Sequence, residues 1–151
     1  MDIINIMNNN RYLDEYIRLC NKEWGSIKSK EELDKYIFEK RNIIVNEDKV
    51  ISILGLIDED TLVGFISLFK YDGDYRRDLT PWYATMYVKE EYRNKGYSKM
   101  LNNAVIEEAK ELGYKKMYLK TELVNYYEKF GFKYMEMLND SEKLYYLDIE
   151  D

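Results

Sequence analysis

The stretch VKEEYRNKGYSKMLNNA, residues 88–104, places a basic turn with one glycine between an apolar strand and a helix. The run WYATMYV predicts the strand, and the apolar spacing that starts at Leu101 predicts the helix. The first amides of a helix lack partners within it, and the helix dipole places partial positive charge there. Gly96 permits a tight turn, and Arg93, Lys95 and Lys99 add positive charge beside it. The stretch therefore predicts an anion-binding site, and a phosphate or pyrophosphate is the expected ligand.

An ordinary solvated loop between a strand and a helix is the alternative interpretation of these residues. Two nucleotide-binding motifs are absent, since the chain contains neither GxGxxG nor GxxxxGK[ST]. The turn is thus neither a dinucleotide fingerprint nor a P-loop, and its meaning depends on the rest of the chain.

The composition is typical of a folded protein. With 151 residues, 46% hydrophobic and 34% charged, the chain predicts one domain over residues 1–151. The formal net charge of −6 argues against a phosphate-backbone partner, so no nucleic acid is expected. The N-terminus has no signal-peptide pattern, and the longest apolar run, VISILGLI, is too short to span a membrane. Together with a single cysteine, these features predict a cytoplasmic location and no membrane partner.

Several kinds of catalytic and metal site are excluded by what the sequence lacks. It contains no histidine, which removes Ser–His and Cys–His nucleophile pairs and imidazole zinc sites. The DGD sequence at residues 72–74 lacks the spacing of a calcium loop, so no metal site is expected. Cys20 lies on the apolar face of an expected helix and is interpreted as a small core residue, not a nucleophile.

Apolar periodicity predicts the order of helices and strands along the chain. After a short apolar start, Asn9 or Asn10 is expected to cap the first helix, and Ser29 the second. The apolar runs on either side of Asp58-Glu59-Asp60 predict an antiparallel hairpin. One α+β domain with a mixed sheet fits these elements. The expected helices cover residues 8–24, 28–42, 98–113 and 123–131, and the expected strands cover residues 50–58, 62–71, 82–88, 115–121, 132–138 and 143–149.

Two motifs together resemble those of the GNAT superfamily of acyl-CoA N-acyltransferases. In that family an apolar strand ending in Val precedes R/Q-x-x-G-x-G/A at the start of a helix, and Y-x-x-x-G-F follows further along. This chain has Val88, then RNKGYS at residues 93–98, then YEKFGF at residues 127–132. Each motif alone is weak, whereas the pair at this separation is fairly specific. The order of elements also agrees across nearly the whole chain.

The resemblance implies a fold and a reaction. The implied fold is a single α+β GNAT-like domain with a central, mixed, mostly antiparallel twisted sheet of about six or seven strands, and about four helices on both faces. The implied enzyme is an acetyl-CoA-dependent N-acetyltransferase with acetyl-CoA as co-substrate. A primary amine would attack the thioester directly in a ternary complex.

The resemblance also implies roles for individual residues. The strand before the turn would splay from its parallel neighbour, and backbone groups near Met86, Tyr87 and Val88 would hold the pantetheine arm and polarise the thioester carbonyl. Tyr127 would protonate the departing thiolate. Which of Tyr126 and Tyr127 faces the cleft is left open, with Tyr127 favoured. The expected contacts of the turn with the coenzyme are Arg93, Asn94, Lys95, Gly96, Tyr97, Ser98 and Lys99.

Two positions depart from the family pattern. Ser98 stands where the family has Gly or Ala, so the approach of the helix is expected to differ slightly. Lys120 stands seven residues before Tyr127, where the family often has Asn. Asn125 is the candidate to take over a contact with the coenzyme arm.

The acceptor pocket carries no shared motif, so its residues are candidates by position alone. Trp24 and Trp82 are expected either in the core or in contact with the acceptor. Because histidine is absent, the base would be a carboxylate or bulk solvent. The acceptor could be a small cationic amine, such as a polyamine or amino sugar, or a peptide amine. The carboxylates expected near the cleft are Glu23, Asp72, Asp74, Asp78 and Glu122.

Two other functions fit the same residues, because a shared fold does not fix chemistry. A non-catalytic regulatory module would bind acyl-CoA without releasing free thiol. An interaction domain would bind no coenzyme at all. A homodimer, formed by strand exchange or at a sheet edge, is left open.

Overall fold

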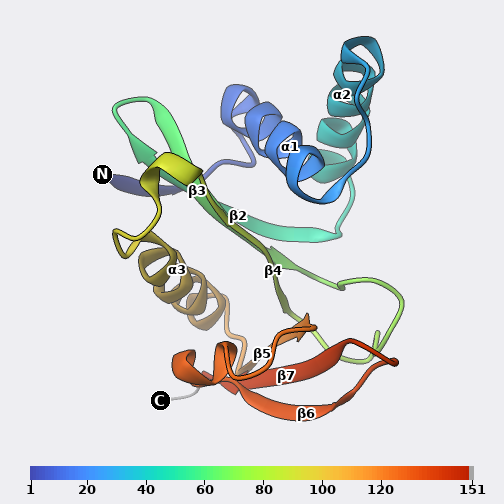
Figure 1. Ribbon diagram of the computed structural model, residues 1–151, viewed down its shortest axis with the longest axis vertical. Coiled ribbons are helices and arrows are strands. Elements are labelled where there is room, and N and C mark those ends of the chain that lie inside the picture. The colour runs from blue at the N-terminus through green and yellow to red at the C-terminus, as the bar shows by residue number, and fades with distance from the viewer. Residues whose placement is uncertain (150–151) are drawn as a thin grey trace.

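The computed structural model of the chain describes residues 1–149, which form one mixed sheet with helices on both faces (Figure 1). Helices α1 and α2 cover one face and α3 covers the other. The helices are α1 (Asn10–Trp24), α2 (Lys30–Asn46) and α3 (Tyr97–Glu111). The strands are β1 (Asp2–Asn5), β2 (Val50–Asp58), β3 (Thr61–Phe69), β4 (Trp82–Val88), β5 (Lys116–Thr121), β6 (Lys133–Met137) and β7 (Lys143–Asp148).

The seven strands follow the order β1-β2-β3-β4-β5-β7-β6. Every neighbouring pair is antiparallel except β4 and β5, which are parallel. This order confirms the expected mixed, mostly antiparallel sheet, and the expected hairpin is the β2–β3 pair. The parallel junction divides the sheet into an N-terminal part, β1 to β4, and a C-terminal part, β5, β7 and β6.

Two segments differ from the expected elements. Residues Asp2–Asn5 form β1, which pairs with β2, where only a short apolar start was expected. This strand is only four residues long, and its two isoleucines are adjacent, so its sequence lacks the apolar alternation that would have predicted it. The segment 123–131 contains a four-residue 3₁₀ helix, Tyr127–Phe130, in place of a fourth α-helix. Asn125 and Gly131, with φ of 58° and 94°, interrupt helical geometry on either side of it.

Side chains at the helix starts explain where α1 and α2 begin. The Asn9 side chain accepts a hydrogen bond from the Tyr12 amide at 3.2 Å, so Asn9 is the cap of α1. The Ser29 hydroxyl accepts one from the Glu32 amide at 3.4 Å at the start of α2, as expected. Within residues 1–149, no helix combines the length and apolar character needed to cross a membrane.

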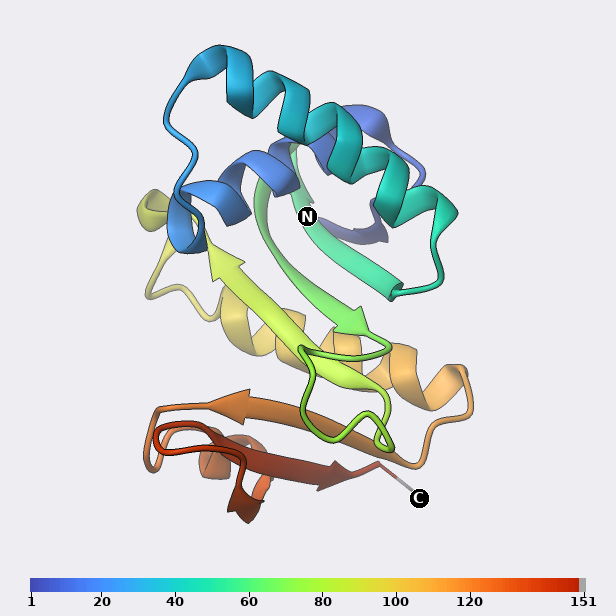
Figure 2. The same cartoon turned by 90° about the vertical axis from the view of Figure 1, so that its right-hand side faces the viewer.

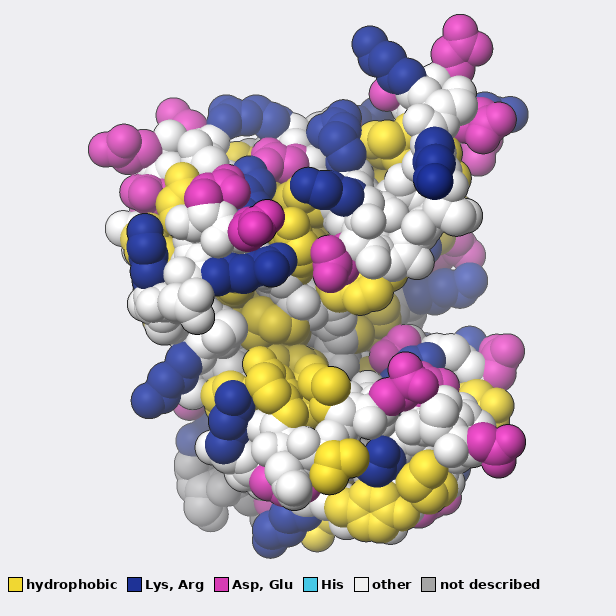
Figure 3. All heavy atoms as spheres, viewed as in Figure 1, with side chains coloured by type: hydrophobic (Ala, Val, Ile, Leu, Met, Phe, Trp, Pro, Cys, Tyr) yellow, Lys and Arg dark blue, Asp and Glu magenta, His cyan; other side chains and the backbone are white. Residues whose placement is uncertain are grey.

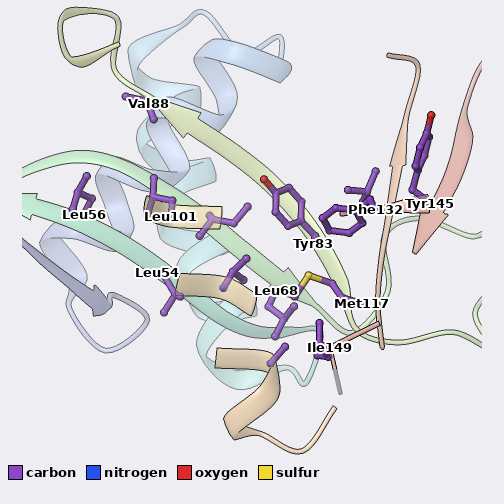
Figure 4. Close-up of a cluster of buried hydrophobic side chains, with 14 of the residues drawn as sticks. Leu54, Leu56, Leu68, Tyr83, Val88, Leu101, Met117, Phe132, Tyr145 and Ile149 are labelled. Atoms are coloured by element: carbon purple, nitrogen blue, oxygen red, sulfur yellow. The ribbon is translucent and has the colours of Figure 1, made fainter. Parts of the chain in front are cut away.

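The two larger apolar cores lie on opposite faces of the sheet, and a smaller cluster contains Trp82, Tyr118 and Leu144. The core beneath α1 and α2 includes Leu13 and Phe65, both fully buried. The core beside α3 includes Leu101 from that helix together with Met117 and Phe132 from the C-terminal half of the chain. Figure 4 shows side chains from the two parts of the sheet meeting in this second core. Packing against α3 therefore connects the two parts across their parallel junction.

Candidate active site

The parallel junction of the sheet opens soon after it begins. Within residues 1–149, β4 and β5 are bridged at one residue pair, Trp82 and Tyr118. The Tyr118 amide also donates to the Pro81 carbonyl at 3.0 Å. Beyond this point the two strands diverge (Figure 2). The remainder of β4 therefore presents backbone groups to an opening, as the resemblance implied.

A cavity of about 490 Å³ occupies this opening and is called the strand cavity below. It lies at the hollow that crosses the middle of the face in Figure 3, between the α1–α2 region and the C-terminal strands. Hydrophobic side chains line this hollow and charged side chains surround it. The strand cavity is lined by Trp24, Asp72, Tyr83, Ala84, Thr85, Met86, Leu119, Lys120, Tyr127 and Glu142.

The basic turn adopts two left-handed backbone conformations just before α3. Asn94 has φ of 64° and Gly96 has φ of 84°. Gly96 occupies the N-cap position and so offers no capping side chain to the first amides of α3. A Cβ atom added at Gly96 would meet no atom within 4 Å, so the space before these amides is open. The geometry suits an anion at the helix start.

A second cavity, of about 440 Å³, lies at this helix start and is called the turn cavity. Trp24 and Met86 line both cavities, so the turn cavity and the strand cavity adjoin. Of the expected coenzyme contacts, Lys95, Lys99 and Asn125 are not among its lining residues. The turn cavity is lined by Glu23, Trp24, Met86, Tyr87, Val88, Tyr92, Arg93, Asn94, Gly96, Tyr97, Ser98 and Tyr126.

Arg93 ties the turn to the end of β4. Its Nε donates a hydrogen bond to the Val88 carbonyl at 2.8 Å, and its guanidinium lies 5.5 Å from the centre of the Tyr87 ring. The charge therefore stays at the junction of strand and turn. Lys95 is instead directed to Tyr92, with its ammonium 5.9 Å from the ring centre.

The two adjacent tyrosines serve different cavities. Tyr126 lines the turn cavity and Tyr127 lines the strand cavity, with their rings 4.8 Å apart and nearly perpendicular. The Tyr127 ring also packs edge-on against Tyr83 and Phe132, at 5.9 and 6.1 Å. Burial raises the pKa of the Tyr127 hydroxyl, and Tyr126 adds to the rise. Tyr127 is therefore protonated at neutral pH.

Two carboxylates and one ammonium face each other in the strand cavity. Lys120 Nζ lies 3.7 Å from Asp72 Oδ1 and 3.9 Å from Glu142 Oε2. All three side chains are about three-quarters buried. Burial raises the pKa of the Asp72 carboxyl, and the Lys120 ammonium opposes that rise. This group carries one more negative than positive charge.

The other expected carboxylates lie in different surroundings. Glu23 lines the turn cavity. Asp74, Asp78 and Glu122 belong to the lining of neither cavity. Asp78 is exposed and accepts hydrogen bonds from Arg76, which lowers the pKa of its carboxyl.

The two tryptophans and the cysteine differ in how deeply they are buried. Trp24, 54% exposed, lies at the junction of the two cavities. Trp82 is fully buried, and its indole N–H donates to the Leu79 carbonyl at 2.9 Å, so it is a core residue. Cys20 packs at the edge of the core beneath α1 and α2, and burial raises the pKa of its thiol to about 12. Such a thiol is not a nucleophile at neutral pH.

One residue of the strand cavity had no signal in the sequence. Thr85 in β4 has φ of 48°, a left-handed conformation that is a genuine outlier for a β-branched residue. Its effect depends on contacts with α1 and β3, which lie far away in the sequence. No local pattern could have identified it.

Solved structures with the same architecture are acetyltransferases. Aminoglycoside 6'-acetyltransferase type Ii is 21% identical, with a TM-score of 0.73 over 100% of this chain and 99% of that chain. The aminoglycoside 6'-N-acetyltransferase from Enterococcus faecium is 19% identical, with a TM-score of 0.73 over 100% and 98%. The PaiA N-acetyltransferase from Thermoplasma acidophilum, in complex with coenzyme A, is 23% identical, with a TM-score of 0.65 over 97% and 98%. At these identities the likeness shows a shared fold.

The family assignment comes from the sequence itself. No curated protein matches the chain significantly in sequence. The model of the acetyltransferase (GNAT) family matches residues 12–132, which include the turn, the opening beside β4 and the Tyr127 motif. This chain therefore belongs to the acetyltransferase (GNAT) family.

Proposed function

We propose that this acyltransferase moves an acetyl group from acetyl-CoA to a primary amine by direct attack in a ternary complex. The observation that carries the proposal is the continuity of two cavities, one at the open start of α3 and one in the gap between β4 and β5. A diphosphate on a long flexible arm fits this shape, with the anion at the helix start and the arm along the unpaired strand edge. PaiA, a structure of the same fold, holds coenzyme A.

The parts of coenzyme A are assigned to the turn and to β4. The amides that follow Gly96 bind the pyrophosphate, and Arg93, Asn94 and Ser98 line its surroundings. The pantetheine arm runs along residues 86–88, whose backbone groups face the gap. A backbone amide there polarises the thioester carbonyl as an oxyanion hole does. Lys95, Lys99 and Asn125 are assigned at most a peripheral contact, because they lie outside both linings.

The chemical step needs one proton donor and one proton acceptor. The neutral amine nitrogen attacks the carbonyl carbon, a C–N bond forms, and the C–S bond breaks. The leaving thiolate takes the proton of Tyr127, which lines the strand cavity and is protonated at neutral pH. The proton lost by the amine passes to a carboxylate or to solvent. Asp72 is the candidate acceptor because it lines the same cavity and burial raises the pKa of its carboxyl, which makes it a stronger base than an exposed aspartate.

A small cationic amine is the acceptor that the strand cavity favours. The Lys120 ammonium already lies between Asp72 and Glu142, which shows that this position accommodates a positive charge. The excess negative charge there attracts a second ammonium of a polyamine or amino sugar. Structures of this fold include aminoglycoside 6'-acetyltransferases. A peptide amine remains the alternative acceptor.

Donor binding is tested by thermal unfolding with acetyl-CoA, with ATP and NAD as controls. At about 100 times its dissociation constant, a ligand adds roughly 2.7 kcal/mol, several degrees for a chain of this size. A shift specific to acetyl-CoA is expected, and the absence of any shift would refute the donor site. Amines are then screened for release of free thiol. Binding without thiol release from any amine, whether polyamine, amino sugar or peptide, would favour the regulatory module instead.

A further inference from the structure

The backbone of β4 contains a bulge in the segment that lines both cavities. Ser67 pairs with Ala84 and Phe65 pairs with Tyr87, so one residue of β3 faces two residues of β4. The extra residue is accommodated at Thr85, where φ is 48°. A β-branched side chain strongly disfavours this conformation, which persists only where the surroundings enforce it.

Three hydroxyl groups meet at this strained residue. The Thr85 hydroxyl donates to Ser67 Oγ, and the Tyr16 hydroxyl lies 2.8 Å from Ser67 Oγ and 3.2 Å from Thr85 Oγ1. These contacts close a ring in which each hydroxyl can donate once and accept once. Tyr16 and Ser67 are 4% and 0% exposed, so their hydrogen bond is shielded from competing water, whereas Thr85 is half-buried and lines the strand cavity. Tyr16, Ser67 and Thr85 are called the hydroxyl cluster below.

The position of Tyr16 is itself fixed by packing. Its ring meets the Phe65 ring edge-on at 4.6 Å, and it lies in the buried core between α1 and the sheet. On the other side of the bulge, β3 and β4 approach closely, because a Cβ at Gly64 would lie 2.6 Å from the Tyr87 carbonyl oxygen. The bulge is therefore held at two points, by the hydroxyl cluster before it and by the close approach at Gly64 after it.

We propose that Tyr16, acting with Ser67, is a positioning residue that holds Thr85 in its left-handed conformation and so aims the β4 backbone at the acyl-CoA. The inference rests on the proposed function, since it explains how the unpaired edge of β4 acquires its direction. Tyr16 touches no substrate in this scheme, because its hydroxyl is engaged with Ser67 and Thr85. It connects helix α1 with the strand that is proposed to bind the donor.

The test is a double-mutant cycle with Tyr16→Phe and Thr85→Gly. Glycine adopts the left-handed conformation without strain and needs no hydroxyl to enforce it. Tyr16→Phe is expected to weaken acetyl-CoA binding about fivefold in the wild-type background, the ratio that corresponds to about 1 kcal/mol for one hydrogen bond. In the Thr85→Gly background the same substitution is expected to change the dissociation constant less than about twofold. Titration calorimetry measures all four proteins, and Tyr12→Phe, one turn earlier in α1, is the control for loss of a tyrosine hydroxyl.

A second measurement does not require any ligand. Hydrogen exchange of the amides in residues 84–88 is expected to accelerate in Tyr16→Phe, whereas the amides of β2 keep their wild-type rates. Unchanged exchange at residues 84–88, or equal weakening of binding in both backgrounds, would reduce Tyr16 to an ordinary core residue and overturn the inference. If wild-type protein bound no acetyl-CoA, the proposed function would fall. The exchange rates would then still decide whether the hydroxyl cluster holds the strand.

Discussion

Replacing Gly96 by aspartate, and separately by asparagine, isolates the charge preference of the turn. The two side chains have nearly the same size, and both tolerate left-handed backbone better than other residues do. A Cβ at this position would meet no atom within 4 Å, so neither variant is expected to clash. The φ of 84° costs each variant roughly 1–2 kcal/mol or less, which lowers Tm by roughly 2–4 °C per kcal/mol. The variants therefore differ in charge while sharing their strain.

The electrostatic cost to the pyrophosphate follows from Coulomb's law. A carboxylate about 6 Å from one phosphate charge costs roughly 0.7 kcal/mol at the dielectric of water and roughly 2.8 kcal/mol at an effective dielectric of 20. For two phosphate charges at an intermediate dielectric, the sum is about 3 kcal/mol, or roughly a hundredfold in Kd. Gly96→Asp is therefore expected to bind coenzyme A about a hundred times more weakly than Gly96→Asn.

Titration calorimetry with coenzyme A at low salt gives this ratio directly. Repeating the titration at about 0.5 M NaCl is expected to shrink it, because salt screens exposed charges. Matching melting temperatures of the two variants would exclude misfolding as the cause. Equal affinities of Gly96→Asp and Gly96→Asn at low salt would mean that no anion lies near the turn, and the assignment of the pyrophosphate would be wrong.

Three further predictions concern the strand cavity and its walls. Tyr127→Phe is expected to lower kcat for thiol release roughly a hundredfold with KM for acetyl-CoA changed less than about twofold, since the ring contacts remain and the proton donor is lost; an unchanged kcat would remove Tyr127 from the chemistry. Gly64→Ala is expected to cost about 2–3 kcal/mol in urea unfolding, because its Cβ would lie 2.6 Å from the Tyr87 carbonyl oxygen, and an unchanged midpoint would contradict that close approach. The pKa of Asp72 is raised in the folded state, so its contribution to stability falls as pH rises from the unfolded pKa towards the folded one. Asp72→Asn is expected to flatten the decline of unfolding free energy as pH rises above about 4, the ordinary pKa of an aspartate, and a steeper decline in the variant would refute the raised pKa.

The elements that the sequence predicted are those with strong local signals. Helix caps and periodic apolar faces are properties of a few neighbouring residues. The structure has Asn9, one of the two expected candidates, and Ser29 as caps, and it contains α1, α2 and α3, whereas the expected helix at residues 123–131 is a short 3₁₀ helix. A tight turn at Gly96 was likewise expected, and the structure gives this glycine a left-handed conformation with φ of 84°. The opening between β4 and β5 was inferred from the resemblance and not from the residues, because strand separation leaves no local pattern.

The features that sequence reasoning missed depend on contacts between distant residues. Strand β1 forms because it pairs with β2, and its four-residue sequence is too short to predict a strand by itself. Trp82 could equally have lain in a pocket or a core until its burial and its bond to Leu79 were known. The strain at Thr85 depends on Tyr16 and Ser67, which belong to other elements. Side chains of this kind become informative only when the fold brings them together.

The single bridge between β4 and β5 affects how the two parts of the sheet are held together. Backbone ladders hold each part of the sheet in register, but among the described residues the Trp82–Tyr118 pair alone continues the ladder across the junction. Side chains also join the two parts, in the core beside α3 and in the smaller cluster of Trp82, Tyr118 and Leu144. Apolar contacts are non-directional and fix an angle less tightly than a ladder does. A ligand bound in the gap would contact both parts and connect them where backbone hydrogen bonds between β4 and β5 are missing. Ligand occupancy and the cooperativity of unfolding are therefore linked in this architecture.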